Sequence, residues 1–454
     1  MVERGATPEG GDGRTPGGNR APEAVTALAV TVTIDVALAA GVSSPVRAGR
    51  RVGGEPFVCA RGEGPYAFDT EGRRFIDYIM AYGPLLFGHT PPYLRGLEAV
   101  AGAGAVRGST SPEELRLAER IRAALPSMEK LRFATTGSEA VQGALRIARA
   151  YTGHDAVLKF AGNYHGHFDL ALHRAGASAE TPDAQRSGIP RAVSADVAVA
   201  RYNDLDDVDR QLERVGERLA AILVEPVCAN MGLVEPVPGF LAGLRERADR
   251  CGAVLIFDEV ITWLRLGLGG AQQRTGVRPD LTVVGKILGG GFPIAAFGGR
   301  AEILARLAPD GPCFTGGTHA GMPFAAALGL RVLDHVEREA AALARTAERA
   351  EALAGGIRAS LRALDLHYTV VQLESIVDFK FRSGPATRSY DDQARDDQTA
   401  YAAFYRAARE RGILLPPSHN EVLFLSTAHG ADDVAVTVEA FDASLRELRS
   451  EGIV

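Results

Sequence analysis

Between residues 111 and 300, short apolar runs alternate with stretches in which apolar residues recur every three or four positions. The runs predict buried strands, and the periodic stretches predict helices with one apolar face. The clearest predicted strands are residues 131–134, 157–160, 220–224, 254–257 and 281–285. Strands that alternate with helices in this way are typical of a parallel sheet covered by helices.

Shorter strands are predicted on both sides of this region. Three runs separated by glycine-bearing turns, 56–60, 65–69 and 74–78, predict a small antiparallel meander. After Met322 the pattern predicts two long helices, 322–340 and 342–363. A second α+β lobe is then predicted, with strands at 369–371, 375–381 and 422–425. Its helices are expected at 397–411 and from residue 432 onward.

Three segments lack a regular pattern. Residues 1–22 are rich in Gly and Pro and predict a disordered tail. Residues 25–40 loosely resemble a secretory signal, but Asp35 interrupts them and acidic residues occupy the expected basic leader, so we do not expect a signal peptide. Residues 170–198 are polar and aperiodic, which predicts a long loop that could serve as an active-site lid.

Composition narrows the class of protein. The chain has 454 residues, 46% of them hydrophobic, and a mean hydropathy of −0.01, which fits a soluble globular protein. The net charge is −6 with acidic and basic residues interspersed, so we expect neither a nucleic-acid partner nor a membrane surface. Four cysteines without CxxC or metal-type spacing favour a reduced, cytoplasmic setting.

The candidate chemistry centres on Asp258 and Lys286. Asp258 ends one predicted strand and Lys286 follows the next, 286 − 258 = 28 residues later, with three glycines beyond it. Open α/β sheets bind ligands outside the carboxyl ends of their strands, so both side chains can face one crevice. A lysine there is a candidate Schiff-base nucleophile, and the acid could pair with the pyridinium nitrogen of pyridoxal phosphate (PLP). The alternative is a solvated ion pair.

Other strand ends add polar residues. Thr136, Gly137 and Ser138 form a turn before a helix, which favours either a phosphate site or an ordinary helix cap at Ser138. Tyr164 could cover a flat ring, whereas His165 and His167 lack further local metal ligands. Glu225 and Asn230 lie beyond another strand, and Glu225 could instead be a structural acid that ties down a loop.

Three further features could contact ligands. The glycine-rich turn that contains Gly317 and Thr318 could supply a second phosphate contact, although such a turn is weak evidence by itself. Arg47 could bind a carboxylate, and Glu421 could receive an amine or pair with Arg47. Solvated surface positions are the alternative for both charges. Cys228 is expected to be inert packing.

In combination these motifs resemble the class III, fold-type I PLP-dependent aminotransferases, and within that family the glutamate-1-semialdehyde 2,1-aminomutases. The resemblance covers residues 41–454. It depends on Ser44–Arg47, Tyr82–Pro84, Gly137–Ala140, Tyr164–His167, Glu225–Val227, Asp258–Val260, Gly285–Lys286 and Ser426–His429. It implies a large PLP-binding domain with a mostly parallel seven-stranded sheet flanked by helices, and a small α+β domain. The expected boundaries are a tail at 1–24, an N-terminal segment at 25–98 that joins the small domain, the large domain at 99–335 and the small domain at 336–454.

The resemblance also implies residue roles. Lys286 would bind PLP covalently and move the proton, while Asp258 would keep the ring nitrogen protonated. Val260 and Tyr164 would enclose the ring. The remaining expected cofactor contacts are Thr136, Gly137, Ser138, His165, Glu225, Asn230, Gly317 and Thr318. Thr318 would reach the phosphate of a neighbouring subunit, which implies a homodimer with interfacial active sites. Arg47, Tyr82 and Glu421 would face the substrate.

Departures from the family pattern concentrate on the substrate side. Tyr82 stands where the family has tryptophan, and Asn163 stands where it has cysteine. We therefore hypothesise a transaminase that cycles PLP with pyridoxamine phosphate through an aldimine/ketimine ping-pong mechanism. Its small-molecule donor and acceptor would belong to specialised metabolism such as antibiotic biosynthesis, for example an amino sugar or an unusual amino acid. The alternatives are the aminomutase reaction of tetrapyrrole biosynthesis and a PLP-dependent epimerase or isomerase.

Overall fold

The computed structural model describes residues 37–175 and 187–454. The chain divides into two compact units, residues 1–43 and 44–454, and of the first only 37–43 are described, with one 3-10 turn, η1 (Ala39–Gly41). The tail predicted at 1–24 and most of 25–40 lie outside the described residues. The same holds for 176–186 of the expected lid.

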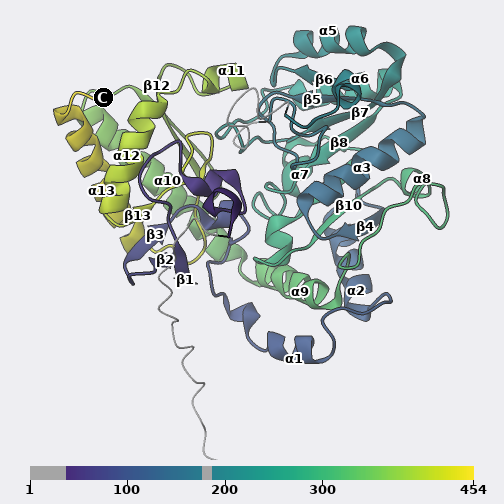
Figure 1. Ribbon diagram of the computed structural model, residues 1–454, viewed down its shortest axis with the longest axis horizontal. Coiled ribbons are helices and arrows are strands. Elements are labelled where there is room, and N and C mark those ends of the chain that lie inside the picture. The colour runs from purple at the N-terminus through teal and green to yellow at the C-terminus, as the bar shows by residue number, and fades with distance from the viewer. Residues whose placement is uncertain (1–36, 176–186) are drawn as a thin grey trace, which may run out of the picture. The chain divides into compact units, whose positions relative to one another are not determined.

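The second unit contains a seven-stranded sheet, which lies on the right in Figure 1. Its order is β4 (Lys130–Ala134), β10 (Ala295–Gly299), β9 (Leu281–Val284), β8 (Val254–Asp258), β7 (Leu219–Val224), β5 (Ala156–Phe160) and β6 (Val197–Ala200). The strands from β9 to β6 are parallel, and β10 is antiparallel to both of its neighbours. The mostly parallel seven-stranded sheet expected from the sequence is confirmed.

Each parallel strand is buried on both faces, because helices cover both sides of the sheet. Successive residues of β7, such as Ile222 and Leu223, belong to different core clusters because they point to opposite faces of the sheet. The cluster of Leu223 includes α3 (Gly137–Thr152), whereas that of Ile222 includes α5 (Leu205–Val215) and α6 (Phe240–Cys251). This double burial explains why the strands read as unbroken apolar runs instead of alternating ones.

Two sequence predictions of local structure are wrong. Residues 170–198 are not one loop, because α4 (Arg191–Ala195) and the start of β6 lie within them. β6 pairs with β5 at the sheet edge, and this pairing, not any local periodicity, buries Val197 and Ala198. The first meander strand is β1 (Cys59–Glu63), about three residues later than predicted, because its register with β2 (Tyr66–Asp69) fixes it.

Two smaller sheets complete the strands. β1, β2 and β3 (Arg74–Asp77) form the predicted antiparallel meander, and β13 (Ile413–Leu414) joins β3 in parallel. The third sheet has the order β11 (Tyr368–Leu373), β12 (Ile376–Ser383) and β14 (Leu423–Phe424), all antiparallel. The β3–β13 pairing shows that the N-terminal segment shares a sheet with the C-terminal part of the chain.

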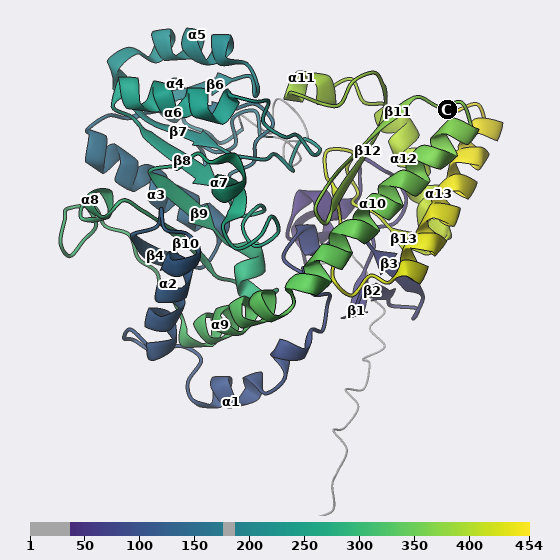
Figure 2. The same ribbon diagram turned by 180° about the vertical axis from the view of Figure 1, so that it is seen from behind.

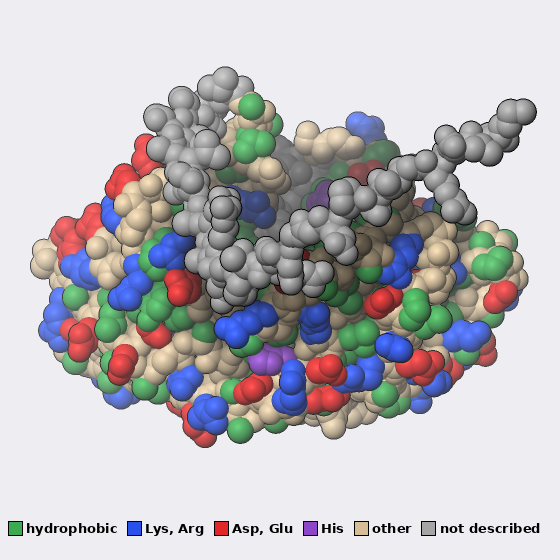
Figure 3. Space-filling view, turned by 90° about the horizontal axis from the view of Figure 1, so that it is seen from below, with side chains coloured by type: hydrophobic (Ala, Val, Ile, Leu, Met, Phe, Trp, Pro, Cys, Tyr) green, Lys and Arg blue, Asp and Glu red, His purple; other side chains and the backbone are tan. Residues whose placement is uncertain are grey.

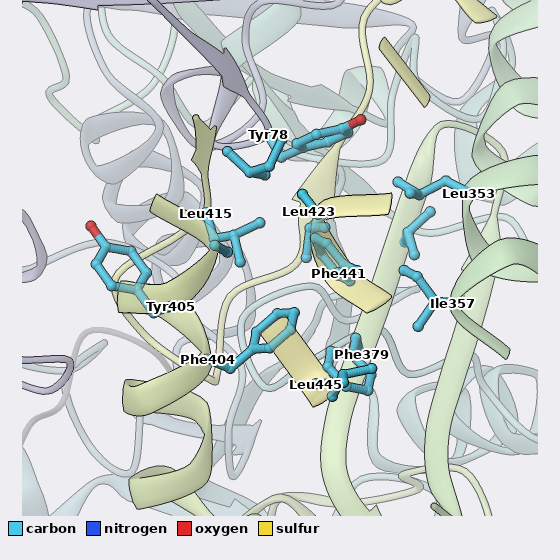
Figure 4. Packing of buried hydrophobic residues seen from close by; sticks show 14 of the residues in the cluster. Tyr78, Leu353, Ile357, Phe379, Phe404, Tyr405, Leu415, Leu423, Phe441 and Leu445 are labelled. Atoms are coloured by element: carbon cyan, nitrogen blue, oxygen red, sulfur yellow. The ribbon is translucent and has the colours of Figure 1, made fainter. Parts of the chain in front are cut away.

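The same two parts of the chain share a core, which we call the second core. It is built from residues 52–78 and 350–448, and Figure 4 shows Tyr78, Leu353, Phe404, Phe441 and Leu445 packed within it. Its helices are α10 (Ala340–Ala363), α12 (Gln398–Glu410) and α13 (Ala431–Ser450). Figure 2 shows α10 leading away from α9 (Pro323–Arg338) to lie beside α13. The domain boundaries expected at 98/99 and 335/336 stay predictions.

The remaining helices are short or local. They are α1 (Leu97–Gly102), α2 (Pro112–Ala124), α7 (Gly270–Thr275), α8 (Ala301–Leu304) and α11 (Tyr390–Gln393), with 3-10 turns η2 (Pro45–Ala48), η3 (Met80–Tyr82), η4 (Pro92–Leu94), η5 (Gly216–Arg218) and η6 (Lys286–Gly289). α2 begins with a capping box. The Ser111 hydroxyl accepts from the Glu114 N–H at 3.1 Å, and Pro112 occupies the first helical position.

The surface matches the interspersed charges of the sequence. On the face shown in Figure 3, the basic and acidic side chains are mixed and neither sign forms a large patch. Across the described ranges, every helix is too short or too polar to span a bilayer.

The second core should account for a large part of the stability. Leu445 of α13 is fully buried, so Leu445→Ala should lower the free energy of unfolding by about 2–5 kcal/mol through lost burial and a residual cavity. Leu115→Ala is the matched control, because Leu115 is 60% exposed and its loss should change stability by at most about 0.5 kcal/mol. Urea unfolding of both variants measures the difference. Equal effects would show that the second core is not tightly packed.

Candidate active site

The carboxyl edge of the central sheet brings Asp258 and Lys286 to one cavity of about 180 Å³. Asp258 is the last residue of β8, and Lys286 begins η6 just after β9. β8 and β9 are adjacent parallel strands, so their ends meet at the same edge. The other residues that line the cavity are Gly137, Ser138, Val141, Tyr164, His165, Gly166, Glu225, Val227, Asn230, Val260 and Ile261.

Asp258 is held by two donors. Its Oδ2 lies 2.7 Å from Nδ1 of His165, and its Oδ1 accepts from the Val260 N–H at 3.1 Å. Burial lowers the pKa of His165, which favours a neutral imidazole that donates its Nδ1 proton to the carboxylate. His165 therefore orients Asp258, and no metal coordination is needed to explain it. Among the described residues, no group of three or more His, Cys, Asp or Glu could hold a metal ion.

Glu225 lines the cavity and accepts hydrogen bonds from two loops, and its expected contact with the cofactor stays a prediction. Its carboxylate accepts from the Tyr164 N–H at 2.6 Å, from the Ala229 N–H at 3.1 Å and from the Asn230 side chain at 2.9 Å. Burial, with the nearby charge of Asp258, raises the pKa of Glu225 to about 7. Glu225 thus joins the loop of Tyr164 to the loop of Asn230, both at the cavity wall.

Asn163 completes this junction. Its Oδ1 accepts from the Glu225 N–H at 3.0 Å, and its amide donates to Sγ of Cys228 at 3.1 Å. Burial raises the pKa of Cys228 well above its usual value, so its thiol stays protonated, as the sequence analysis expected for an inert cysteine.

The predicted phosphate end of the cavity is the N-terminus of α3. The cap is Thr136 and not Ser138: Oγ1 of Thr136 accepts from the Glu139 N–H at 3.2 Å, and the Glu139 carboxylate accepts from the Thr136 N–H at 3.3 Å. This capping box leaves Ser138 in the first turn, on the cavity wall. Gly166 packs directly on Ser138, because a Cβ at Gly166 would lie 2.4 Å from the Ser138 hydroxyl.

Lys286 adopts an unusual backbone conformation at the cavity. Its φ is +46°, a left-handed value that costs a non-glycine residue about 1–3 kcal/mol. Burial lowers the pKa of its amine, and the carboxylates of Glu421, Glu225 and Asp258 oppose that shift. The site therefore holds a lysine that becomes neutral more readily than an exposed one.

The predicted substrate-side residues Arg47, Tyr82 and Glu421 lie outside the cavity lining. Tyr82 ends η3, and a Cβ at the following Gly83 would lie 3.6 Å from Cδ of Lys286. Burial and the charge of Glu421 raise the pKa of Tyr82, and Arg47 opposes them. Burial raises the pKa of Glu421 to about 7, with Lys286 as its strongest opposing charge. Tyr82 therefore lies within electrostatic reach of both other candidates.

Gly317 and Thr318 are not brought to the cavity. Both are exposed, and Gly317 lines a different hollow beside α3. Their expected role in a neighbouring subunit's site stays a prediction.

Two buried basic side chains that support the site were not predicted from the sequence. Lys159 of β5 donates to the carbonyl groups of Ala171 and His173 at 2.6 and 2.8 Å and so fixes the return of the Tyr164 loop. Arg265 donates to the Gly83 carbonyl at 2.6 Å and to the Ser375 hydroxyl at 2.7 Å. The only sequence signal for Lys159 was a lysine inside an otherwise apolar strand.

Comparison with known proteins shows the family. The family model for class-III aminotransferases matches residues 49–439. The chain belongs to the class-III aminotransferases. It is a PLP-dependent enzyme of fold type I, as the sequence motifs predicted. The cavity residues fit that cofactor because a buried acid, a half-buried lysine and a helix N-terminus converge there.

Individual relatives lie within this family. A protein from Thermomicrobium roseum named glutamate-1-semialdehyde 2,1-aminomutase is 44% identical over 411 residues, which cover 90% of this chain and 95% of that protein. An omega-transaminase structure from Sphaerobacter thermophilus is 32% identical with a TM-score of 0.82 and covers 91% of this chain and 95% of its own. A glutamate-1-semialdehyde aminomutase from Pseudomonas aeruginosa in complex with PMP is 27% identical with a TM-score of 0.77, over 87% and 89%.

The buried Lys159 should make stability depend on pH. Burial lowers its pKa from 10.5 to about 7, so between these values the unfolded chain binds a proton that the native protein lacks. The free energy of unfolding then rises with pH through this group. Lys159→Met should lose this rise, so wild type should gain stability relative to the variant between about pH 7 and about pH 10.

Urea unfolding at both pH values checks this expectation. Lys130→Met is the control, because Lys130 is exposed and its removal should leave the pH profile parallel to that of wild type. A Lys159→Met profile that also runs parallel would contradict the expectation.

Proposed function

We propose that Lys286 binds the aldehyde carbon of PLP covalently and that Asp258 holds the ring nitrogen. Val260 and Tyr164 would lie against the two faces of the ring, and Gly137 and Ser138 would bind the phosphate at the N-terminus of α3. The single observation that carries this proposal is that Asp258 and Lys286, from adjacent strands, line one cavity. When bound, PLP withdraws electrons from the substrate carbon that loses a proton.

The protein's own groups would then perform three tasks. Asp258, fixed by His165, would provide the negative charge at the ring nitrogen. Once displaced from the cofactor, the amine of Lys286, made more readily neutral by burial, would accept the substrate proton and return it to the carbon on the other side of the amino nitrogen, which is a 1,3-proton shift. Glu225 and Asn230 would keep the walls of the cavity fixed while this happens.

We propose that the reaction is the glutamate-1-semialdehyde 2,1-aminomutase reaction. Support comes from the 44% identical relative that carries this name and covers nearly the whole chain. In this isomerisation the same carbon skeleton gives and receives the amino group. The enzyme would therefore need no external amino donor and would release no keto acid.

A transaminase with an external donor is the second candidate. Two observations favour it: the solved omega-transaminase has a higher identity and TM-score than the solved aminomutase, and Tyr82 replaces an expected tryptophan near the reacting lysine. An amino sugar or unusual amino acid as acceptor is the hypothesis that the substrate-side departures in the sequence favour. No comparison supports that narrower substrate class or a role in antibiotic biosynthesis.

We further propose a homodimer in which Gly317 and Thr318 complete the phosphate site of the partner. Their exposure, away from the cavity of their own chain, supports this arrangement. A cytoplasmic location remains the expectation from cysteine usage.

A product assay separates the two candidate reactions. Purified enzyme given glutamate-1-semialdehyde alone should produce 5-aminolevulinate in multiple turnovers, because substrate and product are isomers. The product is measured chromatographically with and without added amino donors. Turnover that requires a donor, with release of its keto acid, would instead identify the transaminase.

The covalent attachment at Lys286 can be tested directly. Borohydride should fix the cofactor on the peptide that contains Lys286, and mass spectrometry should find it there and not on Lys130. Lys286→Ala should carry no covalently fixed cofactor after reduction. Its turnover should fall by about 10²–10⁴-fold through loss of the proton acceptor. Lys130→Ala is the matched control. Cofactor fixed on a lysine other than Lys286 would overturn the assignment.

A further inference from the structure

Strand β12 has two faces with opposite chemistry, and both are buried. Val377, Phe379 and Phe381 point into the second core. The alternate residues Asp378 and Lys380 are each only 2% exposed. Antiparallel sheets usually turn a polar face to water, so a charged face that is covered needs an explanation.

The charges on this face are paired with one another. Nζ of Lys380 lies 3.1 Å from Oδ1 of Asp378 and 3.9 Å from Oδ2 of Asp396. Arg382 lies on the same face, and its Nε is 3.4 Å from Oδ1 of Asp396. Three of these charges lie on β12, and Asp396, which precedes α12, is the fourth. None of the four lines the cofactor cavity.

Two loops, residues 230–234 and 418–421, cover these charges. The first is hydrogen-bonded to Asp378 and the second to Lys380. The Leu233 N–H donates to Oδ2 of Asp378 at 3.0 Å. Lys380 donates to the carbonyl of His419. The loops also bond to each other, because the Gly232 N–H donates to the Asn420 carbonyl at 2.8 Å.

Gly232 shows how closely one loop approaches the pair. A Cβ at this position would lie 2.7 Å from both Oδ2 of Asp378 and Cε of Lys380. Its φ of +80° also favours glycine. The contact is therefore built into the loop and is not a chance approach of flexible side chains.

Each loop also carries a residue that is a candidate for contacting the cofactor or substrate, two or three positions from the residue that is bonded to Asp378 or Lys380. Asn230, three residues before Leu233, lines the cofactor cavity. Glu421, two residues after His419, lies where the charges of both Lys286 and Lys380 act on its carboxylate. The ion pair thus holds the backbone next to two residues on opposite loops.

Stability alone does not account for the pair. A buried ion pair costs about as much in desolvation as it gains in attraction, and apolar replacements are often neutral or stabilising. The sequence also uses lysine sparingly: it has only Lys130, Lys159, Lys286 and Lys380 among 50 basic residues. At position 380 the chain therefore uses a compact ammonium group and not the planar guanidinium group that most of its basic residues carry.

We propose that the Asp378–Lys380 pair positions Asn230 and Glu421 around the reacting end of Lys286. Neither Asp378 nor Lys380 lines the cavity, so both are positioning residues that act through the two loops. This inference deepens the proposed function and rests on Lys286 and its cavity being the reaction site.

The test compares charge removal with loop displacement. Lys380→Met should lower the melting temperature, because it leaves Asp378 without its ammonium partner. The double variant Asp378→Leu/Lys380→Met removes both charges, so its melting temperature should recover to near that of wild type. Its kcat/KM should nevertheless stay about 10- to 100-fold below wild type, because the loops lose their anchors. Cofactor retention after borohydride reduction should remain at the wild-type level.

Gly232→Ala provides an independent variant with both charges intact. The added methyl group should push the loop away from the pair and lower kcat/KM in the same range. Lys130→Met is the control and should match wild type in every measurement. A double variant with wild-type kinetics, or a Gly232→Ala variant with wild-type kinetics, would overturn the positioning role.

Amide hydrogen exchange gives a readout that does not depend on turnover. In the double variant the amides of 231–234 and 418–421 should exchange faster than in wild type, whereas those of β8 should not change. Unchanged exchange in both loops would also overturn the proposal. Wild-type protein that binds no cofactor at Lys286 would instead refute the proposed function, and the exchange result would still decide whether the pair anchors the loops.

Discussion

The structure of the site depends on a carboxylate buried at the carboxyl edge of a parallel sheet. Asp258 is 5% exposed, and a buried charge is tolerated only when donors or opposite charges surround it. His165 and the Val260 N–H supply the donors. A second acid, Glu225, is close enough for the charge of Asp258 to raise its pKa, and three further donors hold it. The hydrogen bonds to these two carboxylates fix the loops that form the cavity.

A buried guanidinium group joins distant parts of the chain. Arg265, just beyond β8, donates to Gly83 in the N-terminal segment and to Ser375 and Leu425 in the C-terminal part, and it lies over the ring of Phe424. Burial lowers its pKa to about 9. Because Gly83 approaches Lys286, Arg265 links the second core to the geometry of the reactive lysine.

The four lysines of the chain lie in different environments. Lys130 is exposed, whereas Lys159 and Lys380 are almost fully buried and Lys286 lines the cavity. Surface charge is otherwise supplied by arginine. Ammonium groups are compact and change their pKa readily on burial, whereas guanidinium groups stay charged. Three of the four lysines therefore occupy buried or cavity-lining positions, where a small or titratable group fits, whereas arginine supplies most of the permanent positive surface charge.

The sequence by itself determined the parallel sheet, the family and the pair Asp258 and Lys286, because unbroken apolar runs and the polar residues that end them are local features. It did not determine the cap at Thr136, the edge strand β6 or the start of β1, since competing local hydrogen bonds and strand register decide them. Only the tertiary structure revealed Lys159, Arg265 and the Asp378–Lys380 pair. A charged residue in a strand looks solvated until the loops that cover it are in place, and those loops come from positions more than a hundred residues apart.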